Sequence, residues 1–280
     1  MPPQTQLPLD PATKPFLAPF LPPSPPPHGQ LCRKPYTTLT YATSLDAQLA
    51  ASPGVQTKLS GSATKALTHY LRTQHAAILI GAATAIADDP GLNSRLSGEA
   101  TTAGTSSASA WQQQQPRPVI VDPHFRWGFS RDARCLRAAR EGGGLGPYVL
   151  VSAAAAAASA AKGARDERVR WLQECGGDTI VLDDPPTTTG WEWAYLLDTL
   201  AGLGLHSVMV EGGGRVINDL LRVENRGLVD AVVVTVAPVY LGRGGVAVCP
   251  EVDEPVRFRD VQWAVLGSDV VMAARIDYKM

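Results

Sequence analysis

The chain has 280 residues and a formal net charge of −1, and 18% of its residues are charged. A nearly neutral chain without a basic stripe argues against a nucleic-acid partner and favours a small-molecule ligand. No apolar run reaches membrane-spanning length, and neither a secretory nor a mitochondrial leader pattern is present, so we expect a cytoplasmic protein with no membrane partner. The four cysteines stand apart, with neither zinc nor redox spacing, and no metal site is expected.

The N-terminal segment is rich in proline. Eleven of the 23 prolines lie within residues 1–27. Because proline removes an amide donor and holds the backbone extended, residues 1–30 are predicted to be a disordered or polyproline-like tail. A second low-complexity segment, 97–116, is predicted to be a mobile surface insertion. The rest of the chain is long enough for one large α/β domain or two small ones.

Predicted strands and helices alternate along this remainder. Residues 35–50 begin with β-branched and aromatic residues, which predicts a strand that runs into a loop near Asp46. Short apolar runs predict further strands at 76–81, 118–122, 148–152, 179–184 and 207–211. Helices are expected at 61–74, with Ser62 as N-cap, in the alanine-rich segment 153–177, at 191–205 and after the glycines that follow residue 211.

The C-terminal part adds two predictions. A long strand is expected over 228–242, and a hairpin that turns at residues 267–269 is expected at the end of the chain. The alternation of strands and helices predicts an α/β fold with a mostly parallel central sheet, helices on both of its faces, and a C-terminal antiparallel hairpin.

One turn stands out as a candidate ligand site. Glu211 and three glycines, Gly212 to Gly214, separate an apolar strand from a helix-like run that begins at Arg215. Glycine lets a backbone approach a ligand closely, and the free amides at the start of a helix favour a pyrophosphate. The pattern E-G-G-G-R-V-I is not the usual G-x-G-x-x-G fingerprint, so a tight turn without a ligand is an equal alternative.

Glu211 ends the strand at the edge where open α/β sheets bind ligands. Its carboxylate would repel a phosphate, and we therefore expect it to contact a sugar hydroxyl or a base amine next to the glycine turn. A solvated acid at the end of a strand is the alternative reading of this residue. On the first reading, one site has two neighbouring compartments.

Several collinear segments resemble a known family. TYATSLDAQLA, THYLRTQHAAILIGAATAIADDPGLNSRL, RPVIVD and VMVEGGGRVINDLL, followed by LVDAVVVTVAPVYLG, resemble the riboflavin-pathway pyrimidine reductases, whose fold is like that of dihydrofolate reductase. The resemblance covers most of residues 34–250 and is strongest to the fungal enzymes. It implies one reductase domain over residues 31–280. It also implies a homodimer, for which the long apolar strand 228–242 would be either interface or core.

The activity that the resemblance implies is the NADPH-dependent reduction of 2,5-diamino-6-ribosylamino-4(3H)-pyrimidinone 5′-phosphate to the ribitylamino compound. The hydride would reach the anomeric carbon of the ring-opened imine, and a nearby carboxylate would stabilise the imine's positive charge. Two rival functions are a dihydrofolate-reductase-like enzyme for another pterin or pyrimidine, and a catalytically silent nucleotide-binding module.

The resemblance also implies roles for single residues. The positions implied to bind the cofactor are Ala42, Thr84, Asp88, Val181, Gly212, Gly213, Gly214, Arg215, Val216 and Ile217. The positions implied to bind substrate are Arg72, Leu92, Arg95 and Glu211, and the catalytic candidates are Glu211 and Asp46. The bacterial relatives usually have glycine at the position of Ala47, directly after Asp46.

The residues themselves support part of these assignments. A phosphomonoester requires cationic, preferably bidentate donors, and Arg72 and Arg95 lie on either side of the AILIG strand. Solvated surface arginines are the alternative. Thr84 and Asp88 are four residues apart, so one helical turn would place both on one face.

Overall fold

The computed structural model describes residues 7–23, 34–96, 115–161, 167–185 and 190–278. Within these ranges the core is a nine-stranded sheet in the order β10-β11-β8-β1-β7-β3-β4-β5-β6, and a small second sheet pairs β2 with β9. The strands are β1 (Tyr36–Thr43), β2 (Gln48–Ala50), β3 (Ala77–Gly81), β4 (Arg117–Val121), β5 (Tyr148–Ser152), β6 (Asp178–Leu182), β7 (Ser207–Gly212), β8 (Ala231–Val236), β9 (Val246–Ala247), β10 (Arg257–Leu266) and β11 (Asp269–Asp277).

Most of the large sheet is parallel. The strands from β8 to β6 pair in parallel with their neighbours. At the other end, β11 pairs antiparallel with β8, and β10 pairs antiparallel with β11. The predicted α/β fold, with a mostly parallel sheet and a C-terminal antiparallel hairpin, is therefore confirmed.

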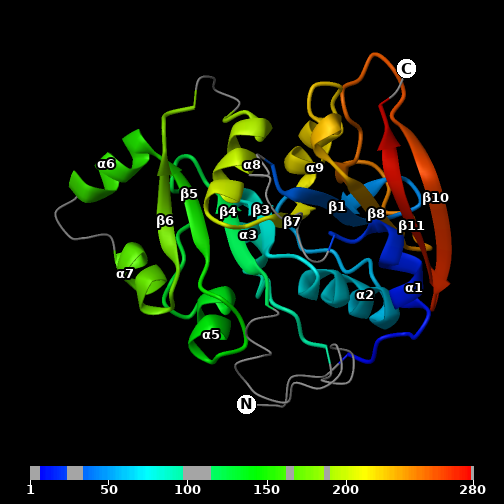
Figure 1. The fold of residues 1–280 in the computed structure, drawn as a ribbon, viewed down its shortest axis with the longest axis horizontal. Helices are drawn as coiled ribbons and strands as arrows, with labels where there is room; N and C mark the ends of the chain where they lie inside the picture. Colours follow the sequence, from blue (N-terminus) through cyan, green and yellow to red (C-terminus); the bar gives the residue numbers. More distant parts are fainter. Residues whose placement is uncertain (1–6, 24–33, 97–114, 162–166, 186–189, 279–280) are drawn as a thin grey trace.

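Helices cover both faces of the sheet (Figure 1). The α-helices are α1 (Thr13–Leu17), α2 (Ser62–Thr73), α3 (Ala82–Asp88), α5 (Arg134–Arg140), α6 (Ala153–Ala161), α7 (Glu167–Glu174), α8 (Trp193–Gly202) and α9 (Gly214–Leu220), and the 3-10 helices are η1 (Ala18–Phe20) and η3 (Arg226–Leu228). Ile78 and its partner Met209 face α2, α3, α5 and α7, whereas Leu79 and Val210 face α8 and α9. Burial on both faces explains why these strands are continuous apolar runs.

Part of the N-terminal segment is folded. α1 and η1 pack onto the face of the sheet that α2 covers, and Leu17 and Phe20 are fully buried there. The prediction of a disordered tail over residues 1–30 is therefore wrong for residues 7–23, because apolar side chains between the prolines find a hydrophobic surface. The rest of that predicted tail lies outside the described residues.

The predicted insertion at 97–116 is tested only at its end. Residues 97–114 lie outside the described part of the chain. Gln115 and Pro116 are buried, and the Gln115 side-chain oxygen accepts a hydrogen bond from the Ser94 amide at 2.7 Å. These last two residues therefore belong to the core and not to a surface insertion.

Two local predictions differ from the structure. The strand expected over 228–242 ends at Val236, and Pro238, which lacks an amide donor, lies in the following loop. Gly61, not Ser62, is the N-cap of α2, where the Asp269 carboxylate accepts a hydrogen bond from the Gly61 amide at 2.8 Å. Helices α3 and α5 were not among the predicted helices. No described helix is long and apolar enough to cross a bilayer.

Candidate active site

A cavity of about 680 Å³ lies at the carboxyl ends of β1, β7 and β3. β3 leads into α3 on one face of the sheet, and the adjacent strand β7 leads into α9 on the other face. Open α/β sheets bind ligands at such switch points, and this volume is within the usual range for small-molecule sites. The predicted site residues that line the cavity are Ala42, Thr84, Asp88, Glu211, Gly213, Gly214, Arg215 and Ile217.

Other predicted residues lie away from the cavity wall. Val181 is on β6, the strand at the far edge of the sheet, and its side chain is 53% exposed. Leu92 is buried in the cluster beneath β3 and β4. Gly212 and Val216 are buried behind the turn. The structure therefore does not bring Val181 to the cavity that contains Thr84 and Gly213.

Glu211 lines the cavity and lies at an irregularity in β7. The register between β3 and β7 shifts after Leu79, which pairs with Val210, so that Ile80 pairs with Gly212 and Glu211 is the extra residue. Bulges of this kind redirect a side chain and occur often beside active sites. Side chains alternate along the strand, so Glu211 shares the side of Met209 and its carboxylate lies where α2 covers the sheet.

There the carboxylate meets Arg72 of α2. Arg72 Nε donates to Glu211 Oε1 and Arg72 Nη2 donates to Oε2, both at 2.7 Å, and Arg72 Nη1 donates to the Asn93 carbonyl at 2.9 Å. The two side chains are only 12% and 17% exposed. Arg72 was expected to bind a phosphate and Glu211 a sugar. Instead, Arg72 Nε and Nη2, which could have bound a phosphate in bidentate geometry, donate to the Glu211 carboxylate. The two residues form an ion pair with no net charge.

Arg72 and Arg95, the two arginines expected to bind a phosphate, are not among the residues that line the cavity, whereas two lysines are. Lys58 and Lys65 both line the cavity. The pKa of Lys65 is lowered, first by burial and then by repulsion from Lys58, Arg95, Arg134 and Arg72. Four cations are thus close enough to Lys65 to disfavour its charged form, and an anionic ligand would relieve that repulsion. The sequence carried no signal for the lysines, because a lysine in a loop or on a helix is usually a solvated residue.

The glycine turn that follows Glu211 forms another part of the lining, the glycine wall. Gly212 and Gly213 have φ values of +96° and +27°, and α9 begins at Gly214, one residue before the predicted start. The Gly213 amide donates to the Thr84 hydroxyl at 3.1 Å, and a Cβ at Gly213 would lie 2.7 Å from that oxygen. Glycine is therefore required here by both backbone conformation and space. Two predicted cofactor residues contact each other, and Gly213 and Gly214 face the cavity.

Helix α3 places Thr84 and Asp88 together, as expected from their spacing, and both line the cavity. Burial raises the pKa of the Asp88 carboxyl. Tyr41, which sequence reasoning missed, also lines the cavity, and burial raises its pKa to about 12. Its hydroxyl consequently stays protonated near neutral pH and can donate a hydrogen bond to a ligand.

Asp46 lies outside the cavity wall. Its carboxylate accepts hydrogen bonds from the Ser44 hydroxyl at 2.5 Å, the Leu241 amide at 3.1 Å and the Gly242 amide at 2.7 Å. The pKa of the Asp46 carboxyl is lowered to about 2, chiefly by the hydrogen bond from Ser44 and next by that from the Leu241 amide. The carboxylate thus joins the β1–β2 turn to the loop that follows β8.

A cavity at a switch point, lined by a glycine turn, two lysines and a carboxylate that is paired with an arginine, is typical of an α/β protein that binds a small molecule. The family model of the RibD C-terminal domain matches residues 35–272, and the chain belongs to this family. The reductase of Debaryomyces hansenii named for 2,5-diamino-6-ribosylamino-4(3H)-pyrimidinone 5′-phosphate is 36% identical over 275 residues, which are 96% of this chain and 98% of that one.

Other relatives agree with this assignment. The Saccharomyces cerevisiae reductase of the same name is 32% identical over 86% of this chain and 87% of its own. The solved structure of the riboflavin biosynthesis reductase from that yeast has a TM-score of 0.70 and 29% identity, and it covers 94% of this chain and 99% of that chain. The resemblance to the reductase family is thereby confirmed, and the chain is an oxidoreductase.

Proposed function

We propose that the protein reduces 2,5-diamino-6-ribosylamino-4(3H)-pyrimidinone 5′-phosphate to its ribitylamino product with NADPH, in riboflavin biosynthesis. The names of the fungal relatives support the substrate, since the match extends over nearly the whole chain. The observation that carries the proposal is that Glu211 and the glycine turn that follows it line one cavity. Such a cavity brings a dinucleotide and a second ligand into contact.

The glycine wall fits a reduced nicotinamide dinucleotide. Gly213 and Gly214 present backbone without a Cβ, and Thr84 and Asp88 lie beside them as hydrogen-bonding groups. A Cβ at Gly213 would lie 2.7 Å from Thr84 Oγ1, so only glycine lets the backbone pass this close to Thr84. The nicotinamide, when bound, supplies the hydride. NADPH is preferred to NADH in this proposal because of the family resemblance.

Glu211 and the cations near it fit the ribosyl phosphate. Each Glu211 oxygen accepts one bond from Arg72 and keeps capacity for another, so it can accept from a sugar hydroxyl or a ring amine. Lys58, Lys65 and Arg95 supply the positive charge that a phosphate requires.

In this arrangement the chain's own residues position the reacting groups. The ion pair with Arg72 restrains the Glu211 side chain, so its carboxylate is already oriented when substrate binds. Because Arg72 neutralises most of the charge of Glu211, we assign Glu211 mainly to orientation of the sugar, with a smaller contribution to stabilising the protonated imine. We assign Asp46 to the loop after β8 and not to the chemistry.

We also propose a homodimer in the cytoplasm. β10 is an edge strand, and its outward side carries Val261, Trp263 and Val265, of which the last two are 60% and 74% exposed. An uncovered apolar edge strand is a surface that natural proteins normally cover. The cytoplasm is supported by the riboflavin-pathway resemblance and by Cys135, Cys175 and Cys249, which are unpaired.

The test is an initial-rate assay with the diaminopyrimidine ribosyl phosphate and either NADPH or NADH. We expect oxidation of NADPH that depends on this substrate, with a smaller kcat/KM for NADH. Oxidation that depends on dihydrofolate instead would favour the rival enzyme. NADPH binding without turnover of any pyrimidine or pterin would favour a silent nucleotide-binding module and contradict the proposal.

A further inference from the structure

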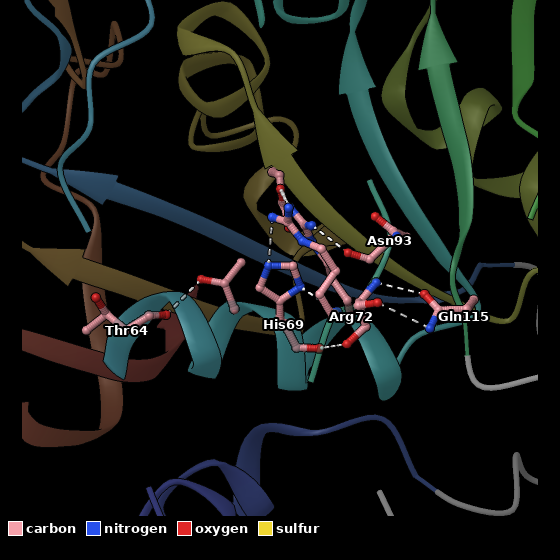
Figure 2. Close-up of polar contacts among 9 residues, drawn as sticks. Thr64, His69, Arg72, Asn93 and Gln115 are labelled. Carbon is pink, nitrogen blue, oxygen red and sulfur yellow. Dashed lines mark hydrogen bonds and ion pairs between the residues drawn. The ribbon is translucent and has the colours of Figure 1, made fainter. Parts of the chain in front are cut away.

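His69 lies at the centre of a polar cluster that joins α2 to the segment containing Arg95 (Figure 2). The Arg95 amide donates to His69 Nδ1 at 3.1 Å, and the Ser94 hydroxyl donates to the His69 carbonyl at 2.9 Å. One turn further along α2, Arg72 donates to the Asn93 carbonyl. Three consecutive residues, 93–95, are therefore held on one side of α2.

The tautomer of His69 follows from these contacts. The side chain is buried, and the pKa of the ring is lowered to about 2. Burial is the largest cause, and repulsion from Arg72 and Arg95 follows. The ring is therefore neutral. A neutral ring has one N–H. Because Nδ1 accepts from the Arg95 amide, the proton resides on Nε2. That nitrogen lies 3.3 Å from Arg95 Nη2, which is also a donor.

The Arg95 guanidinium consequently lacks an acceptor in this direction. His69 Nε2–H cannot accept from Nη2, and Arg95 Nε is buried without a hydrogen-bond partner among the described residues. Buried donors without acceptors are costly, and an anionic oxygen would offset that cost. Arg95 is also close enough to Lys65, on the cavity wall, to lower the pKa of that lysine.

We propose that His69 is a positioning residue for substrate binding, which fixes the main chain of Arg95 and leaves the Arg95 guanidinium donors for the phosphate of the substrate. The proposal rests on the proposed function, because it names the phosphate of that substrate. A histidine that accepted from the guanidinium would satisfy Arg95 internally and compete with the ligand. With its proton on Nε2, His69 cannot accept from the guanidinium.

The test compares His69→Phe, which keeps an aromatic ring and removes both nitrogens, with His69→Asn, whose amide oxygen takes the place of Nδ1. Loss of one hydrogen bond predicts a rise of roughly three- to tenfold in the substrate KM for His69→Phe. The NADPH KM and kcat should stay within about twofold of wild type. His69→Asn should lie nearer to wild type, and ribose 5-phosphate should inhibit His69→Phe more weakly than wild type.

Arg95→Met provides the background that separates positioning from core packing. If His69 acts through Arg95, then His69→Phe should cause no further rise in substrate KM when Arg95 is already methionine. An unchanged substrate KM, equal rises in both KM values, or an undiminished effect in the Arg95→Met background would each overturn the proposal. Should His69→Phe fail to fold, His69→Asn and ribose 5-phosphate binding decide it. Wild-type protein without substrate-dependent oxidation would instead refute the proposed function.

Discussion

Replacing Glu211 by glutamine removes one charge from a buried ion pair while it keeps the volume of the side chain. In the wild type both carboxylate oxygens accept from Arg72 at 2.7 Å. Glutamine retains one acceptor and loses the other, and hydrogen bonds to charged groups contribute about 1.5–3 kcal/mol. We therefore expect the free energy of unfolding to fall by about 2 kcal/mol and Tm to fall by roughly 4–8 °C.

Catalysis should suffer separately from stability. If Glu211 also accepts from the sugar or the ring, its amide replacement loses a second charge-assisted bond, and kcat/KM should fall roughly 10- to 100-fold. NADPH affinity should not change, because the glycine wall is intact. The measurements are initial rates of NADPH oxidation below the melting temperature, NADPH binding by fluorescence, and thermal unfolding by calorimetry.

The matched control is Arg72→Met, alone and combined with Glu211→Gln. The double variant removes both charges, so it should recover part of the stability that either single variant loses. It should not recover turnover. A Glu211→Gln variant that melts earlier but keeps kcat/KM within about twofold of wild type would refute the reasoning, since the acid would then serve only Arg72.

Three further changes test other parts of the account. Gly213→Ala places a Cβ 2.7 Å from Thr84 Oγ1, so the NADPH KM should rise while the substrate KM stays unchanged. Equal rises in both KM values would contradict a cofactor wall. Thr84→Ala, as a second change, should relieve part of the clash. Asp46 has its pKa lowered from 3.8 to about 2, so its stabilisation is present above about pH 4 and is lost as the pH falls towards 2. Asp46→Asn should lower Tm near neutral pH and flatten this acid dependence, and an unaltered pH profile of Tm would exclude the loop-holding role. Trp263→Arg should yield monomers in sedimentation, and an unaffected dimer would remove β10 from the interface.

The sheet was predictable from the sequence because burial on both faces leaves a local pattern. β3, β4 and β5 each coincide within a residue or two with an apolar run, and the glycine at residue 267 marks the hairpin. β8 was overestimated because the apolar run continues beyond Val236, where the chain has already left the sheet. α1 was missed because prolines obscured Leu17 and Phe20, whose burial depends on a surface formed by distant residues.

The site was predictable in part. Motifs singled out Thr84, Gly213 and Glu211, and all three line one cavity, since each lies at or just after the end of a strand that the pattern marks. The pairing of Arg72 with Glu211 joins residues 139 positions apart and has no local signal. The same holds for Lys65, and for the cap that Asp269 provides to α2. Such contacts depend on which helix covers which strand end, and only the tertiary structure determines that.

Hydride transfer within one cavity is tested most directly by isotope labelling. NADPH that carries deuterium at the transferred position is incubated with the diaminopyrimidine ribosyl phosphate in ordinary water, and the product is analysed by mass spectrometry and NMR. We expect one deuterium on the ribityl carbon that was the anomeric carbon, because nicotinamide and sugar would be in direct contact. Product that contains no deuterium, or deuterium at another carbon, would contradict the placement of both ligands in the cavity between Glu211 and Gly213.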